Sequence, residues 1–151
     1  MKAKSFSLLD QWGNRRTLEQ FEGTYVVVYF YPKDFTSGCT KEAEAFRDAA
    51  ERFEALGAKI VGISKDSVES HAKFANKLGL SFPLLSDPDL GVTERYGAIG
   101  PKNMYGKIVQ GVLRSTFLIG PDGTLLRSWN RVRVPGHIEA VLEALARYKT
   151  S

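Results

Sequence analysis

The stretch "TYVVVYFYPKDFTSGCTKEAEAF", residues 24–46, decides the fold. Its first part, residues 24–32, is an unbroken run of apolar, β-branched and aromatic residues, which is typical of a strand buried on both faces of a sheet. From the second part onward apolar residues recur at helical spacing, at Cys39, Ala43 and Phe46, and then beyond the stretch at Ala50 and Phe53. The change of period predicts a strand, a short loop and an amphipathic helix.

The same alternation continues along the chain. "LGAKIVGIS" provides a glycine stop and a second buried strand over residues 59–64, so strand, helix and strand predict a parallel pair with a crossover helix. "DSVESHAKFANKLGL" predicts a helix that is capped by Asp66 or Ser67 and ends at Gly79. "SFPLLSDPDLGVTERYGA" predicts a short strand, a turn and a short helix, and residues 99–111 an irregular loop.

The C-terminal part changes the topology. "LRSTFLIGPDGTLLRSW" predicts an antiparallel hairpin around the turn "GPDG", and a final amphipathic helix is expected over about residues 136–147. Alternating strands and helices followed by a hairpin and a closing helix predict an α/β protein with the thioredoxin-like fold, a central mixed sheet flanked by helices. With 151 residues and no linker or repeat, we expect one domain over residues 1–151.

The net charge of +4 is mildly basic and identifies no partner. The densest basic cluster is Arg127, Arg131 and Arg133 around Trp129, a combination that can hold a nucleic-acid backbone. Because no nucleic-acid motif accompanies it, we expect solvent-facing side chains and no nucleic-acid partner.

The chain has one cysteine, so it can form no intramolecular disulfide. Its first residues, "MKAKSFSLLD", become polar too soon to supply the core of a signal peptide. No apolar run reaches the length of a membrane span. We therefore expect a cytoplasmic protein without a membrane partner.

Cys39 follows the first buried strand, and ligands gather at this end of the strands in open α/β sheets. If the helix begins near Ser37, Cys39 lies in its first turn, where free N–H groups and the helix dipole stabilise an anion such as a thiolate. An inert buried cysteine and an anion-holding loop are equally consistent with this position alone.

Pro32, Thr36 and Cys39 in "PKDFTSGC" resemble the active-site signature of the peroxiredoxins. The segments "VGISKDSVESHAKFANKLGL", "FPLLSDPD", "RYGA", "MYGK" and "RSTFLIGPDG" are similar to the peroxiredoxin Q, or bacterioferritin comigratory protein, branch and occur in its order. The resemblance runs from about Leu8 to the final helix.

This resemblance implies a thiol peroxidase that reduces hydrogen peroxide or organic hydroperoxides. Cys39 would be the peroxidatic cysteine, Thr36 would hydrogen-bond the peroxide, and Pro32 would wall the pocket. Arg114 would hold both thiolate and peroxide, and backbone N–H groups around Gly38 would add to its effect. No cofactor is needed, because the sulfur carries the redox change.

Other roles are open for the helper residues when the resemblance is set aside. Thr36 suits a helix cap, Pro32 a strand terminator, and Arg114 a surface ion pair. Glu42 lies one helical turn after Cys39, and we expect it either to orient Arg114 or to face solvent.

Two positions depart from the branch pattern. Ser37 replaces a common proline, and Glu44 stands where many members carry a resolving cysteine. A sulfenic acid on Cys39 must then be recycled by an external thiol. The expected reductants are thioredoxin, glutaredoxin, a small thiol, or Cys39 of another subunit, in a monomer or weak homodimer.

The remaining candidates offer less. His71 and His137 have no carboxylate or cysteine at ligand spacing, so we expect no metal site and assign both to capping or surface positions. Tyr105 is expected to be an ordinary packed aromatic residue. The absence of a C-x-x-C motif excludes dithiol exchange.

Overall fold

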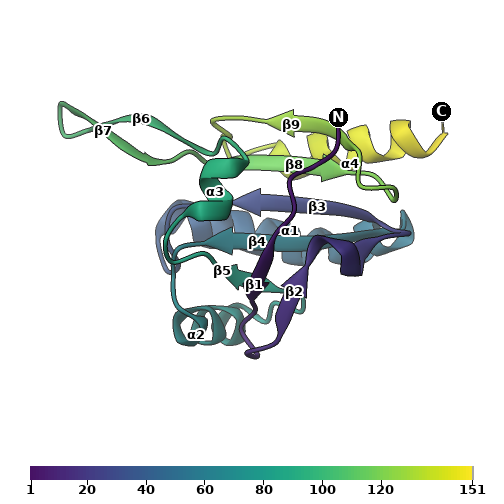
Figure 1. Ribbon diagram of the computed structural model, residues 1–151, viewed down its shortest axis with the longest axis horizontal. Coiled ribbons are helices and arrows are strands. Elements are labelled where there is room, and N and C mark those ends of the chain that lie inside the picture. Colours follow the sequence, from purple (N-terminus) through teal and green to yellow (C-terminus); the bar gives the residue numbers. More distant parts are fainter. Residues whose placement is uncertain (151) are drawn as a thin grey trace.

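A mixed seven-stranded sheet forms the centre of the molecule in the computed structural model, which describes residues 1–150 (Figure 1). The sheet order is β2-β1-β5-β4-β3-β8-β9, and β6 and β7 form a separate two-stranded sheet. The strands are β1 (Ser7–Leu9), β2 (Arg15–Thr17), β3 (Tyr25–Phe30), β4 (Ala58–Ser64), β5 (Leu84–Ser86), β6 (Ile99–Met104), β7 (Lys107–Val112), β8 (Ser115–Ile119) and β9 (Leu125–Trp129). The helices are the 3-10 turn η1 (Leu18–Phe21), α1 (Ser37–Ala55), α2 (Val68–Leu78), α3 (Gly91–Arg95) and α4 (His137–Thr150).

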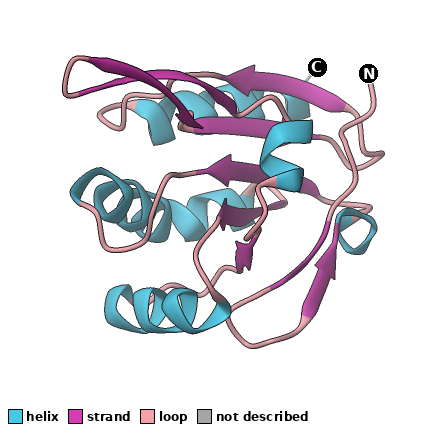
Figure 2. Ribbon diagram, turned by 60° about the vertical axis from the view of Figure 1, so that its left-hand side comes forward, coloured by secondary structure: helices cyan, strands magenta, loops and turns pink. Residues whose placement is uncertain are grey.

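β3 lies inside the sheet and is buried on both faces, as its uninterrupted apolar run predicts. Val27 and Tyr29 pack into a core that includes residues of α1, α2 and α4, whereas Val28 and Phe30 point into a second core covered by α3 and the N-terminal segment. Figure 2 shows the resulting arrangement, with helices on both sides of the strands. Because both faces are covered, a strand with no polar alternation is stable here.

The pairing of β3 positions the functional site. β3 runs parallel to β4, from Tyr25 opposite Ala58 to Phe30 opposite Ile63, which confirms the predicted parallel pair. On its other side β3 runs antiparallel to β8, with Phe30 opposite Ser115. The loop that follows β3 and the residue that precedes β8 therefore meet at the same end of these two strands.

The prediction of an irregular loop over residues 99–111 is wrong. These residues form most of the β6–β7 hairpin, which projects from the body of the molecule (Figure 1). Its turn places Tyr105 and Gly106 at φ 54° and 84°, the positive values that a tight two-residue hairpin turn requires. Tyr105 is fully exposed, so the expectation of a packed aromatic residue is also wrong. The sequence does not indicate this hairpin, because most of its side chains are exposed and do not alternate between apolar and polar residues.

The surface positions predicted for the two histidines are wrong as well. His71 is fully buried in α2, and His137 at the start of α4 is 6% exposed. In contrast, Arg127, Arg131 and Arg133 face solvent as expected. In the described part of the chain, no helix combines the length and apolar character needed to cross a membrane.

Candidate active site

Cys39 lies in the first turn of α1, as the sequence predicts. The helix begins at Ser37, and its first backbone hydrogen bond runs from the Thr40 N–H to the Thr36 carbonyl at 2.9 Å. The N–H groups that precede Thr40 therefore have no partner one turn back in the helix. Cys39 is 2% exposed, so its sulfur lies just beneath the surface at the positive end of the helix dipole.

The guanidinium of Arg114 lies between the cysteine and a carboxylate. Its Nη2 donates to Cys39 Sγ at 3.3 Å, and its Nη1 donates to Glu42 Oε1 at 2.7 Å. The Glu42 side chain is fully buried and that of Arg114 is 17% exposed. These contacts exclude the alternatives of a solvent-facing Glu42 and a surface ion pair for Arg114.

Burial and charge pull the Glu42–Arg114 pair in opposite directions. Burial raises the pKa of Glu42 to about 7 although the Arg114 charge lowers it, and the second oxygen, Oε2, has no hydrogen-bond partner among the described residues. Burial lowers the pKa of Arg114, but Glu42 and Cys39 together raise it above its ordinary value. Arg114 therefore stays charged beside the sulfur.

His137, the first residue of α4, contacts β8 near Arg114 and stays neutral. Burial, with a contribution from the Arg114 charge, lowers the pKa of His137 to about 4. Its Nε2 is 2.8 Å from Thr116 Oγ1 on β8. In the described part of the chain neither histidine hydrogen-bonds Cys39, so neither is placed to accept the proton of its thiol directly.

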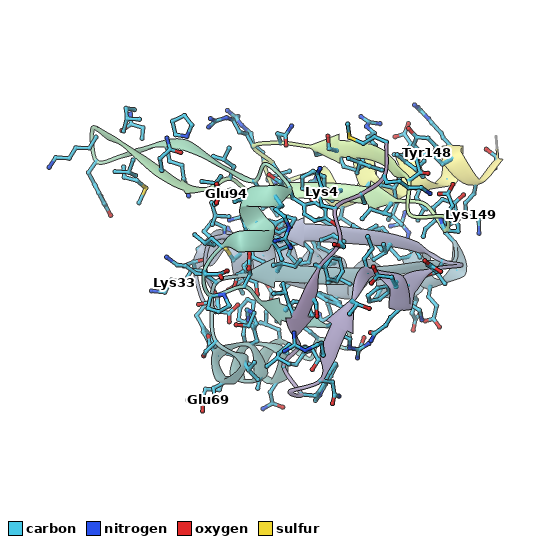
Figure 3. The ribbon with its side chains drawn as sticks, viewed as in Figure 1. Lys4, Lys33, Glu69, Glu94, Tyr148 and Lys149 are labelled. Carbon is cyan, nitrogen blue, oxygen red and sulfur yellow. The ribbon has the colours of Figure 1, made fainter. Side chains whose placement is uncertain are left out.

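The other site residues predicted from the sequence lie around this centre. Thr36 occupies the N-cap position of α1, but its Oγ1 donates to the Lys33 carbonyl at 2.7 Å and makes no cap hydrogen bond. Pro32 is half-buried just after β3, and Glu44 is half-buried on α1. Gly38 permits a close approach, because a Cβ there would lie 3.1 Å from Arg114 Nη2. Lys33 marks this end of the molecule, opposite Lys149 of α4 (Figure 3).

The sequence missed a polar cluster directly beneath the loop. Asp34, Asp66 and His71 each bring a side-chain ligand atom within 4.8 Å of the others. Although no carboxylate stands at ligand spacing from His71 along the sequence, the fold brings two carboxylates close to it. Three different segments supply these residues, so no local spacing could indicate the cluster. It stands apart from Cys39 but contacts the loop that carries it.

Comparison with known proteins places this geometry in a family. Residues 1–128 match the model of the AhpC/TSA family. The chain is 48% identical to peroxiredoxin Bcp of Xanthomonas campestris pv. campestris, over 88% of this chain and 83% of that protein. It is 40% identical to peroxiredoxin Bcp of Escherichia coli K12, over 97% and 94% of the two chains.

Solved structures agree with the sequence relatives. A peroxiredoxin Q structure from Xanthomonas campestris superposes with a TM-score of 0.91 at 45% identity, covering 95% of this chain and 91% of that one. A mutant peroxiredoxin Q from Xylella fastidiosa gives 0.90 at 37% identity, covering 98% and 96%. These likenesses confirm the thioredoxin-like fold expected from the sequence. The chain therefore belongs to the AhpC/TSA family, and within it to the peroxiredoxins of the Bcp, or peroxiredoxin Q, branch.

Proposed function

We propose that this protein is a thiol peroxidase that reduces hydrogen peroxide and organic hydroperoxides through Cys39. The observation that carries the proposal is the 3.3 Å contact between Arg114 Nη2 and the sulfur of the chain's single cysteine, at the start of a helix. A fixed positive charge and free N–H groups at this place favour the thiolate, which is the attacking form of a thiol.

In the chemical step the Cys39 thiolate attacks one oxygen of the peroxide ROOH and the O–O bond breaks. The sulfur is oxidised to a sulfenic acid, Cys39–SOH, and the departing oxygen takes up a proton and leaves as ROH. Arg114 stabilises the negative charge that moves from sulfur to the departing oxygen, because its guanidinium offers several fixed N–H donors. Glu42 keeps that guanidinium aimed at the sulfur through its 2.7 Å contact.

Three further residues shape the peroxide site. Thr36 already donates its proton to the Lys33 carbonyl, so its lone pairs remain available to accept a hydrogen bond from the peroxide. Pro32 walls the pocket and keeps water from the sulfur. Gly38 leaves room for Arg114, and its backbone N–H adds a donor at the helix start.

An external thiol completes the cycle. The chain has no second cysteine, and Glu44 occupies the usual resolving position. A thiol R′SH attacks Cys39–SOH to give the mixed disulfide and water, and a second R′SH releases the Cys39 thiol with R′SSR′. Thioredoxin, glutaredoxin and small thiols are the candidate reductants, and a monomer or weak homodimer is sufficient for this cycle.

Substrate range, location and domain organisation belong to the same proposal. A solved structure of the Xanthomonas campestris bacterioferritin comigratory protein carries a title that describes alkyl peroxide reduction by that protein, which supports organic hydroperoxides as substrates here. A reduced Cys39 requires a reducing compartment, so we expect the cytoplasm. We treat the whole chain, residues 1–151, as one peroxidase domain that needs no cofactor or metal.

The test mixes fully reduced protein with equimolar hydrogen peroxide or an alkyl hydroperoxide, and follows thiol loss by stopped flow and product by intact mass. We expect thiol loss far faster than that of free cysteine and one added oxygen on the protein. Cys39→Ser should show neither change. Thioredoxin, glutaredoxin and a small thiol, added separately, identify the reductant. A rate no better than that of free cysteine would sink the proposal.

Gly38→Ala tests the close approach of Arg114. The new Cβ would lie 3.1 Å from Nη2, so the guanidinium must shift by a few tenths of an ångström from its place beside the sulfur. Because sub-ångström misplacement of a catalytic group is costly, we expect the rate of thiol oxidation to fall about 10-fold. Gly91→Ala is the matched control. Gly91 also lies in the first turn of a helix, α3, and its new Cβ would lie 3.1 Å from Asp89 Oδ1. Equal rates for both variants would contradict the proposed role of Gly38.

A further inference from the structure

A buried network of polar side chains lies under the loop that leads into Cys39, and the peroxidase step does not use it. Its centre is Asp34, which is 2% exposed and whose carboxyl group makes three side-chain hydrogen bonds. The Tyr31 hydroxyl donates to Oδ1 at 2.6 Å, and the Ser70 hydroxyl donates to Oδ2 at 2.8 Å. The third contact joins the same Oδ2 to His71 Nδ1 at 2.7 Å.

The second nitrogen of His71 bonds to the backbone of β5. Nε2 is 3.0 Å from the Leu85 carbonyl oxygen, which can only accept, so Nε2 carries a proton. On the other side of the ring, Nδ1 lies against Asp34 Oδ2. The imidazole thus connects the loop to β5, and every polar atom of the Asp34–His71 pair has a partner.

The backbone of the loop is held at the same residue. The Asp34 N–H donates to Asp66 Oδ2 at 2.9 Å, and the Ser64 hydroxyl donates to that same oxygen at 2.6 Å. Side chains from the residue after β3, from the β4–α2 loop and from α2 therefore all contact Asp34. Cys39 follows only five residues later.

The loop needs such an anchor because its backbone is strained. Phe35, the residue after Asp34, has φ 66°, a left-handed conformation that is unfavourable for a residue with a Cβ. Its ring is 49% exposed and makes one edge contact with Phe74, with rings 5.1 Å apart. This turn directs the chain into Thr36 and the start of α1.

We propose that Asp34 and His71 are positioning residues that hold the strained loop so that Cys39 Sγ stays within reach of Arg114. The inference rests on the proposed peroxidase function and goes beyond it by assigning a role to a network that contacts neither sulfur nor guanidinium. Without the network, Phe35 can relax and the first turn of α1 shifts relative to β8. The thiol then loses its contact with Arg114 while remaining chemically intact.

The test compares Asp34→Asn with Asp10→Asn. Asp10 is an equally buried carboxylate with three donors, the N–H groups of Trp12 and Asn14 and the Arg16 side chain, and it lies in the β1–β2 turn away from Cys39. For each protein we measure the melting temperature, the rate of thiol loss with hydrogen peroxide, and the rate of alkylation by iodoacetamide. Alkylation requires an accessible thiolate and so responds to the Arg114 charge, but it has no departing peroxide oxygen for Arg114 to stabilise.

We expect both variants to lower the melting temperature, but only Asp34→Asn to slow peroxide reduction, by about 10-fold and by more than it slows alkylation. Tyr31→Phe removes one donor only and should slow peroxide reduction about 3-fold. If Asp34→Asn does not fold, the peroxide rate of Tyr31→Phe tests the proposed role of the network instead. Unchanged peroxide rates in the folded variants, or an equal loss in Asp10→Asn, would overturn the proposal. If the unmodified protein itself reacts no faster than free cysteine, the proposed function fails instead.

Discussion

Arg114→Ala is expected to slow the reaction of Cys39 with hydrogen peroxide by about 100- to 1,000-fold, the usual cost of removing one donor aimed at developing negative charge. The guanidinium is the only side chain that hydrogen-bonds the sulfur within residues 1–150. Its removal takes away the fixed charge beside the thiolate and the donors for the departing oxygen. Stopped-flow measurement of thiol loss checks this result.

Arg114→Lys separates charge from geometry. Lysine keeps the positive charge but has a single nitrogen, so it cannot donate to Cys39 Sγ and Glu42 Oε1 from a planar fork. We expect its rate to fall between those of the unmodified protein and Arg114→Ala.

Arg52→Ala is the matched control for the loss of an arginine–glutamate pair. Arg52 lies on α1 and donates twice to Glu139, at 2.6 and 3.0 Å, but this pair is exposed. We expect the Arg52 variant to retain the full peroxide rate. An Arg114→Ala variant that folds and reacts within a few-fold of the unmodified protein would refute the assigned role.

The second large effect is on stability, and it depends on pH through Glu42. Burial raises the pKa of this carboxyl from 4.5 to about 7, so between these values the folded protein binds a proton that the unfolded chain has released. The contribution of Glu42 to the free energy of unfolding is therefore fully present below about pH 4.5 and is lost as the pH rises through about 7. The loss is about 3 kcal/mol for a shift of this size.

His137 acts in the opposite direction over the same range. Burial lowers its pKa from 6.5 to about 4, so the unfolded chain binds the extra proton between these values. Its contribution to stability is present above about pH 6.5 and lost as the pH falls towards 4. In the unmodified protein the two contributions oppose each other.

Two variants should reveal the opposing contributions. In Glu42→Gln only His137 of the pair titrates, and the free energy of unfolding should fall as the pH is lowered from about 7 to about 5. In His137→Gln only Glu42 titrates, and the free energy of unfolding should rise over the same interval. Urea unfolding followed by circular dichroism measures both slopes. If both variants keep the slope of the unmodified protein, these groups do not control it.

Much of the fold follows from short-range pattern. The apolar run of β3 and the helical spacing after it placed Cys39 in the first turn of α1, and the structure confirms that position. Turn chemistry at "GPDG" predicted the β8–β9 hairpin in the same way. These predictions succeed because burial on both faces, helix periodicity and turn residues are each set by neighbours along the chain.

What the sequence missed or predicted wrongly depends on contacts between distant residues, on very short strands or on exposed ones. β1 and β2, for which the sequence makes no prediction, have three residues each, too few for a recognisable period, and the β6–β7 hairpin is largely exposed. His71 and His137 looked like surface residues because nothing near them in sequence shows that they are buried. Their burial results from packing against β5 and β8.

The sequence determined the chemistry through its resemblance to the peroxiredoxins, which assigned the peroxide-reacting role to its single cysteine and named Arg114 as a partner. Tertiary structure decided how the residues around that cysteine come together. Arg114 lies 75 residues away and reaches Cys39 because β3 and β8 are paired antiparallel. Asp34 and His71, 37 residues apart, meet because α2 packs beneath the loop. No residue spacing records such contacts, because they arise from strand order and packing.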